Sequence, residues 1–158
     1  MDIEINKSPR HSKITGDFGE ALVLYWLSKY GFECARLDHT GIDLIARNPH
    51  TKELMGISVK SRSRSAGTER SSLRIPANNF EKADLACAAF SCTPYFAIVI
   101  DEGKIIRGYL LSMAHLLTLF PDTKSGAYWR MGEQFLNRFA GDAEIKAFEL
   151  HTTTKRWW

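Results

Sequence analysis

Two short apolar segments of this chain each carry one ionisable residue whose type and position could support phosphate chemistry. The segment Gly41–Ala46 contains Asp43, and the segment Gly56–Arg62 contains Lys60. Both are rich in β-branched and aliphatic residues and are separated by turn-forming residues, so we expect two adjacent strands. A lysine inside a central strand needs a partner for its charge, and Asp43 is the expected one. An Asp–Lys pair across neighbouring strands is a place where a phosphate could be held.

A third candidate lies on the helix expected before these strands. The helix is predicted to begin near Asp17, whose side chain can cap it, and to end at Tyr30 before Gly31. Glu20 shares a helical face with apolar residues that follow it, so its carboxylate should point toward the sheet. The alternative is a capping box, in which Glu20 returns to the amide of Asp17. Because the two charged strand residues are also present, we favour a functional carboxylate.

Ser58 and Arg62 flank Lys60 at alternate positions of the same predicted strand. Alternation places these three residues on one face, while Ile57 and Val59 point the other way into the core. Beside the aspartate of the preceding strand, the row would form a cationic groove with one acidic ligand. The alternative is an edge strand with a solvated face, whose lysine discourages aggregation.

Basic residues are concentrated after Lys60 and near the N-terminus. The stretch 63–72 combines serine, arginine and glycine, which is typical of a mobile loop. Arginine suits a phosphate clamp because its guanidinium matches the phosphate oxygens bidentately, and a solvated linker is the alternative. The residues predicted to contact DNA are Lys13, Arg62, Arg64 and Arg70.

Together these features resemble the PD-(D/E)XK nuclease-like superfamily, in particular its branched-DNA resolvase and restriction-endonuclease-like branches. The resemblance covers about residues 16 to 112 and rests on the helical glutamate, the Gly-Ile-Asp-Leu-Ile-Ala strand and the Ser-Val-Lys strand. It implies that Asp43 is the first metal-binding aspartate of the motif and that Lys60 is the catalytic lysine. Glu20 matches the helical glutamate that many members add. Ser58 departs from the motif, since the family has Asp, Glu or sometimes Gln at this position.

The resemblance implies a metal-dependent DNA phosphodiester hydrolase, an endonuclease-like enzyme that uses Mg²⁺ or Mn²⁺. Glu20, Asp43 and the Val59 carbonyl would hold the ion, and Ser58 would contribute through a water. A hydroxyl is a poor ligand for a hard divalent ion compared with a carboxylate, so we expect weak metal binding. The alternative is a catalytically weakened or inactive nuclease-like domain that binds nucleic acid or a protein partner.

The composition is that of a globular protein with one domain. The chain has 158 residues, of which 44% are hydrophobic and 25% are charged, and this is enough to build a real core. Its net charge of +3 permits a nucleic-acid partner without proving one. We expect a flexible basic arm over residues 1–14 and a single nuclease-like domain over residues 15–158.

Three cysteines without a Cys-x-x-Cys pair predict free thiols in a reducing compartment and argue against structural zinc. The polar N-terminus shows no signal peptide, and the apolar run 110–120 is too short to span a bilayer. We therefore expect a cytoplasmic protein. The histidines show no metal-ligand spacing.

Trp157 and Trp158 are expected to pack on the protein body or on a second subunit, as in a homodimer. A structural subunit that associates through them and through 110–120 is a third hypothesis, from a different functional class.

The order of the expected elements is helix, three strands, helix and two strands. It predicts an α/β fold with a mixed central sheet flanked by helices, and the resemblance implies a restriction-endonuclease-like core. The predicted helices are 17–30, 80–89, 112–119 and 133–139. The predicted strands are 33–37, 43–47, 54–62, 95–100, 104–111 and 145–150.

Overall fold

A six-stranded mixed sheet forms the centre of the molecule, in the order β1-β2-β3-β5-β6-β8. The structure, a computed structural model, describes residues 5–157. Strands β3 and β5 run parallel, and every other pair of neighbours in this sheet is antiparallel. The strands are β1 (Glu33–His39), β2 (Ile42–Arg47), β3 (Leu54–Ser63), β5 (Thr93–Asp101), β6 (Ile105–Ser112) and β8 (Lys146–His151).

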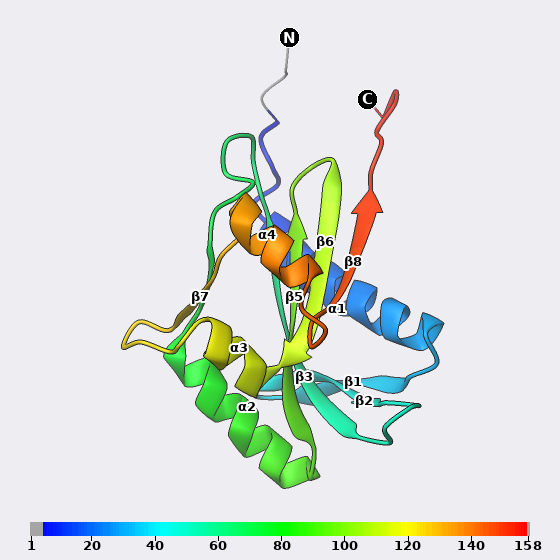
Figure 1. Cartoon of the computed structure of the whole chain (residues 1–158). Coiled ribbons are helices and arrows are strands. Elements are labelled where there is room, and N and C mark those ends of the chain that lie inside the picture. The colour runs from blue at the N-terminus through cyan, green and yellow to red at the C-terminus, as the bar shows by residue number, and fades with distance from the viewer. Residues whose placement is uncertain (1–4, 158) are drawn as a thin grey trace.

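Helices cover both faces of this sheet (Figure 1). Helix α1 (His11–Lys29) packs on one face, and α2 (Ala77–Phe90), α3 (Met113–Leu119) and α4 (Glu133–Ala140) pack on the other. A small two-stranded sheet packs beside these three helices and consists of β4 (Leu73–Ile75) and β7 (Ala127–Trp129). The predicted α/β fold with a helix-flanked mixed sheet is therefore confirmed. Within residues 5–157, none of the helices has both the length and the apolar character that crossing a bilayer requires.

Helix α1 is held on the sheet by a stripe of aliphatic side chains. Leu22, Val23 and Leu27 are buried against the face of β3 that carries Ile57. Burying a side chain of this size contributes about 1.5–3 kcal/mol. The stripe fixes the orientation of α1 and so determines which of its residues reach the neighbouring strands.

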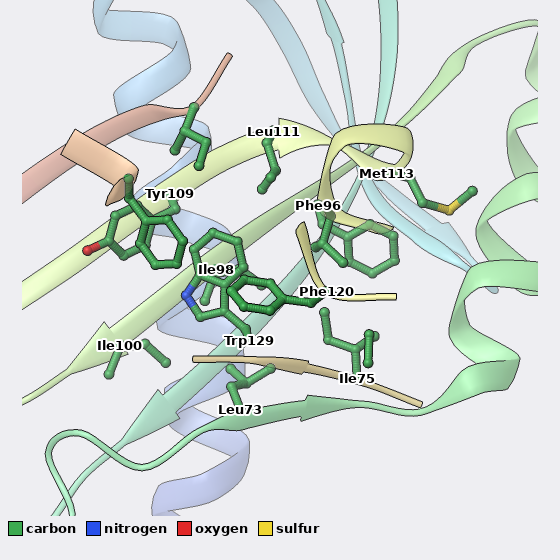
Figure 2. Packing of buried hydrophobic residues seen from close by; sticks show 14 of the residues in the cluster. Leu73, Ile75, Phe96, Ile98, Ile100, Tyr109, Leu111, Met113, Phe120 and Trp129 are labelled. Atoms are coloured by element: carbon green, nitrogen blue, oxygen red, sulfur yellow. The ribbon is translucent and has the colours of Figure 1, made fainter. Parts of the chain in front are cut away.

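An aromatic core covers the opposite face (Figure 2). Phe96, Ile98 and Ile100 of β5 are fully buried there, together with Trp129 of β7. The indole of Trp129 stacks on the ring of Phe139 with 4.3 Å between ring centroids. This core anchors β5, and β5 in turn pairs with β3 from Met55 to Ser63.

The ends of the elements differ from the predicted ones in ways that matter for the site. Helix α1 begins at His11 rather than near Asp17, so the predicted arm over residues 1–14 ends within a helix. Residues 1–4 of that arm lie outside the described residues. The sequence did not predict β4 and β7, because a three-residue strand is too short to show an alternating pattern.

Gly19 allows α1 to approach β3 closely. A Cβ atom at this position would lie 1.7 Å from the Ser61 hydroxyl oxygen and 2.8 Å from its Cβ. Gly16 lies one turn earlier on the same helix, and a Cβ there would meet nothing within 4 Å.

We expect Gly19→Ala to lower the free energy of unfolding by about 1–3 kcal/mol, because the added methyl overpacks the contact between α1 and β3. Gly16→Ala is the matched control and should raise it by about 1 kcal/mol through helix propensity. Urea unfolding of both variants measures the difference. Equal gains in the two variants would show that the α1–β3 contact does not depend on Gly19.

Candidate functional site

Asp43 is placed by the tight turn between β1 and β2. Gly41 has a φ of +105°, and a Cβ there would lie 2.2 Å from the Lys82 carbonyl oxygen, so only glycine lets the turn sit against α2. The Asp43 Oδ2 atom accepts a hydrogen bond of 2.7 Å from the Val59 backbone N–H. The side chain of Asp43 thus extends the hydrogen bonding between β2 and β3 beyond their backbone pairs, and the bond fixes the carboxylate beside β3.

The carboxylate of Glu20 on α1 lies within electrostatic range of Asp43. Burial raises the pKa of Glu20 above its usual value, and the negative charge of Asp43 raises this pKa further. The charge of Arg36 on β1 acts in the opposite direction on the same pKa. The two carboxylates are thus close enough to repel each other, and their joint role in one site stays a prediction.

The capping-box alternative for Glu20 is wrong, because Asp17 does not cap the helix. Arg10 stands at the N-cap position of α1, and Asp17 lies within the helix. The Asp17 carboxylate forms an ion pair with Lys13 on the helix surface, with 3.3 Å between Nζ and Oδ2. Glu20 is therefore free of the capping role that the sequence also allowed.

Lys60 lies on an interior strand, so the edge-strand alternative is also wrong. Its Cα partner on β5 is Ile98, and β2 flanks the other side of β3. Burial lowers the pKa of Lys60, the charge of Asp43 opposes this, and the charges of Arg62 and Lys82 lower the pKa further. Among the described residues, no ion pair within 4.0 Å joins Lys60 to Asp43. The expected direct pair is not formed, and the two charges interact over a longer distance.

Ser58 is buried, with only 3% of its surface exposed. Its Cα partner on β5 is Phe96, and it shares a strand face with Lys60. Where the family motif has a carboxylate or an amide, this chain therefore has a small neutral hydroxyl in a closely packed position. The acidic groups of the candidate site are Glu20 and Asp43.

Two basic residues near this site were missed in the sequence. Lys82 of α2 influences the pKa of Lys60, and Arg36 of β1 influences the pKa of Glu20. Each is a single basic residue in an element with no other sign of function. Only the packing of α2 and β1 brings them to the site, so no local pattern could have identified them.

Two of the arginines predicted to contact DNA are engaged within the protein. The guanidinium Nη2 of Arg64 donates to the carbonyl oxygens of Ser71 and Ser72 at 3.0 and 3.1 Å. The guanidinium of Arg70 forms an ion pair of 2.6 Å with Glu102. These contacts hold the loop after β3 against the body of the protein, and each engages one guanidinium nitrogen of its arginine.

The other two predicted DNA contacts, Arg62 and Lys13, are exposed. The ion pair of Lys13 with Asp17 is solvent-exposed on both sides, and such pairs contribute little and break readily. Arg62 donates to the backbone carbonyl of its neighbour Ser61 at 2.8 Å. These two cations are therefore the more accessible ones for a phosphate.

A second group of metal-ligand side chains lies on other elements. His115 of α3 faces Asp142 and Glu144 of the connection before β8, and one ligand atom from each lies within 4.8 Å of the others. The ring nitrogens of His115 lie 2.7 Å from Asp142 and 3.3 Å from Glu144. Histidine spacing gave no sign of this group, because its members come from distant parts of the chain.

The fold resembles that of a solved DNA-junction resolvase. The Holliday junction resolvase Hjc of Archaeoglobus fulgidus matches with a TM-score of 0.54 and 17% sequence identity, over 73% of this chain and 88% of the resolvase. The bacterial homing endonuclease I-Ssp6803I matches with a TM-score of 0.43 and 13% identity, over 92% of this chain and 80% of that chain. No protein-family model and no curated protein matches the sequence. The chain therefore shares the fold of this resolvase, in line with the restriction-endonuclease-like core that the resemblance implied.

Proposed function

We propose that the protein binds DNA and hydrolyses its phosphodiester bonds with the help of a divalent metal ion, Mg²⁺ or Mn²⁺. The observation that carries the proposal is the electrostatic coupling of Glu20, Asp43 and Lys60. These residues come from α1, β2 and β3 of a fold shared with a DNA-junction resolvase.

The two carboxylates suit a hard divalent cation. Burial and the charge of Asp43 raise the pKa of Glu20, so a cation between the two carboxylates would relieve an existing repulsion. Val59 N–H holds Oδ2 of Asp43 and leaves Oδ1 for a ligand. The Val59 carbonyl and a water beside Ser58 would complete the ligand set. When bound, the ion would polarise a phosphate oxygen and lower the pKa of an attacking water.

Lys60 would act on the phosphate or on the water that attacks it. Burial and the neighbouring cations lower its pKa, so its proton is held less tightly than that of an exposed lysine. Its ammonium makes no ion pair within 4.0 Å with Asp43. The ammonium is therefore available to neutralise negative charge that develops on the phosphate oxygens.

A plasmid-nicking assay tests the proposed activity. Wild-type protein with Mg²⁺ or Mn²⁺ should convert supercoiled plasmid to the nicked form, and Asp43→Asn should not. Chelation of the metal with EDTA should stop the reaction. Wild-type protein that leaves the plasmid intact under saturating Mn²⁺ would refute hydrolysis.

The second candidate is a domain of the same fold that binds DNA but does not cut it. Ser58 favours this candidate, because the hydroxyl leaves the site with two protein carboxylates where a full motif plus the helical glutamate would supply three. DNA binding in EDTA, combined with an intact plasmid in Mn²⁺, would identify this candidate as the correct one.

Arg62→Ala is expected to weaken DNA binding on all sequences alike and to reduce the slope of log K against log salt by about 0.9. The reason is that Arg62 is exposed and follows Lys60 on the same face of β3. Arg70→Ala is the matched control, because Glu102 already holds that guanidinium, and it should leave the slope unchanged. Fluorescence anisotropy over a range of salt concentrations measures both slopes. Equal slopes for wild type and Arg62→Ala would remove Arg62 from the interface.

The predicted homodimer stays a prediction. Trp157 is 76% exposed, and Trp158 lies outside the described residues. Gel filtration at several protein concentrations would determine the oligomeric state.

A further inference from the structure

A pocket of about 420 Å³ opens between the start of α1 and the end of β3. Its lining includes the basic side chains Lys7 and Arg62, and the remaining lining residues are one histidine, serines and a threonine. It includes no carboxylate and no large apolar side chain. A cavity that combines cations with hydroxyl groups in this way suits a small oxyanion rather than an apolar ligand.

The wall of this pocket is built by contacts between segments far apart in the sequence. The ammonium of Lys7 donates to the Ser63 hydroxyl oxygen at 2.9 Å and to the Arg64 carbonyl oxygen at 2.8 Å. The His11 Nε2 atom lies 3.0 Å from the same Ser63 hydroxyl oxygen. These bonds fix the positive charge of Lys7 at the rim before any ligand arrives.

The first turn of α1 adds a second source of positive potential. Ser12 and Thr15, which line the pocket, belong to this helix of 19 residues. Arg10 at the N-cap position offers no side-chain cap, and no acidic residue lies in the first turn. No negative charge in the first turn of α1 therefore offsets the positive end of the helix dipole, and this end can bind an anion.

Ser61 also lines this pocket, and its hydroxyl oxygen packs against Gly19 of α1 without a hydrogen-bond partner among the described residues. Buried hydroxyl groups in folded proteins nearly always have a partner. A phosphate in the pocket would reach this hydroxyl only after the side chain rotates away from Gly19.

We propose that this cavity, the α1 phosphate pocket, binds one phosphate group of a DNA strand that passes the Asp43–Lys60 site. Arg62 lies two residues beyond Lys60 on β3, which corresponds to about 7 Å. Ser12 lies eight residues before Glu20 on α1, which corresponds to about 12 Å along the helix axis. The pocket therefore lies within a few nucleotides of the proposed scissile phosphate. The assignment of DNA rests on the proposed function, whereas the affinity for phosphate does not.

Two matched variants test the pocket. Ser12→Asp and Gln134→Glu each place a carboxylate at the second position of a helix, α1 and α4 respectively. Both should stabilise their helix through the dipole, but only Ser12→Asp puts the negative charge into the pocket. A purely structural role for Ser12 would make the two variants behave alike.

The first measurement compares melting temperatures in sodium phosphate and in sodium chloride of equal ionic strength. Phosphate should raise the melting temperature of wild type and of Gln134→Glu, and it should have no specific effect on Ser12→Asp. Equal phosphate shifts in the two variants would overturn the pocket.

The second measurement is DNA binding in EDTA, which does not depend on metal or cleavage. Ser12→Asp should weaken binding by roughly tenfold or more, because its carboxylate repels the phosphate from the charge-assisted contacts of the pocket, and Gln134→Glu should not. A loss confined to 5′-phosphorylated strands would identify a terminal phosphate, and an equal loss for 5′-hydroxyl strands would identify a backbone phosphate. Unchanged DNA affinity in Ser12→Asp would overturn the DNA assignment. A phosphate shift in wild type without any DNA binding would refute the proposed function and leave the pocket in place.

Discussion

Replacing Lys60 with methionine is expected to slow DNA cleavage strongly and, at the same time, to stabilise the fold at neutral pH. Loss of a group that stabilises transition-state charge costs about 10²–10³ in rate. The stability gain follows because burial lowers the pKa of Lys60, so the charged form is less favourable in the folded state than in the unfolded one. Methionine keeps an apolar stem of similar length without the charge. Lys104→Met, at an exposed position, is the matched control for both readouts.

The stability gain of Lys60→Met depends on pH, and the direction of this dependence follows from the lowered pKa of Lys60. Between its lowered folded-state pKa and the usual value of 10.5, Lys60 binds fewer protons in the folded state than in the unfolded state. Wild-type stability should therefore rise with pH across that range, and the advantage of Lys60→Met should shrink to nothing above it. Urea unfolding at several pH values, together with plasmid nicking, measures both effects. A Lys60→Met protein that cuts at the wild-type rate would refute the catalytic role.

Ser58→Glu is expected to strengthen Mn²⁺ binding by about tenfold, since divalent affinity follows the number of charged oxygen ligands. It should also raise or create nuclease activity. Ser58 is 3% exposed, so the larger side chain should reduce stability by about 1–3 kcal/mol in the absence of metal. Calorimetric titration with Mn²⁺ measures the affinity.

Ser58→Gln separates charge from shape in this experiment. Glutamine has nearly the same size as glutamate and should overpack the position in the same way, but it adds no negative charge and so avoids the cost of burying a carboxylate beside Asp43. Equal Mn²⁺ affinities for the two variants would show that Ser58 does not face the metal site.

The central strands could be predicted because their sequences carry the signal locally. Asp43 and Lys60 each stand out against β-branched and aliphatic neighbours, and the interior position of β3 now explains why a lysine in it matters. Glu20 was predicted from its helical face. The start of its helix was not, because Asp17 looks like a capping residue, whereas the helix begins at His11 without a side-chain cap.

Tertiary contacts explain what the sequence could not show. Arg64 and Arg70 stay predicted phosphate contacts, and no sequence pattern indicated their partners in the folded chain, which are distant carbonyls and Glu102. The approach of Lys82 to Lys60 depends on the packing of α2 beside the β1–β2 turn. Likewise, Lys7 meets Ser63 only after α1 has packed on β3. Each of these contacts joins residues that no local pattern connects.

Glu20 should destabilise the fold at neutral pH when no metal is present. Burial and the charge of Asp43 raise its pKa above the usual value of 4.5, so the folded state favours the protonated form. The stability that this preference provides is fully present below pH 4.5 and is lost as the pH rises through the raised pKa. Glu20→Gln should therefore raise the melting temperature at neutral pH, and the gain should disappear in acid.

Thermal unfolding with increasing Mn²⁺ tests most directly whether Glu20 and Asp43 form one divalent-cation site. Mn²⁺ should raise the melting temperature of wild type in a saturable way, because the ion binds the folded state. Neither Asp43→Asn nor Glu20→Gln should show this shift, whereas His115→Ala should keep it, since His115 belongs to the separate group with Asp142 and Glu144. A shift that survives in Asp43→Asn and disappears in His115→Ala would place the ion at that other group and contradict the account.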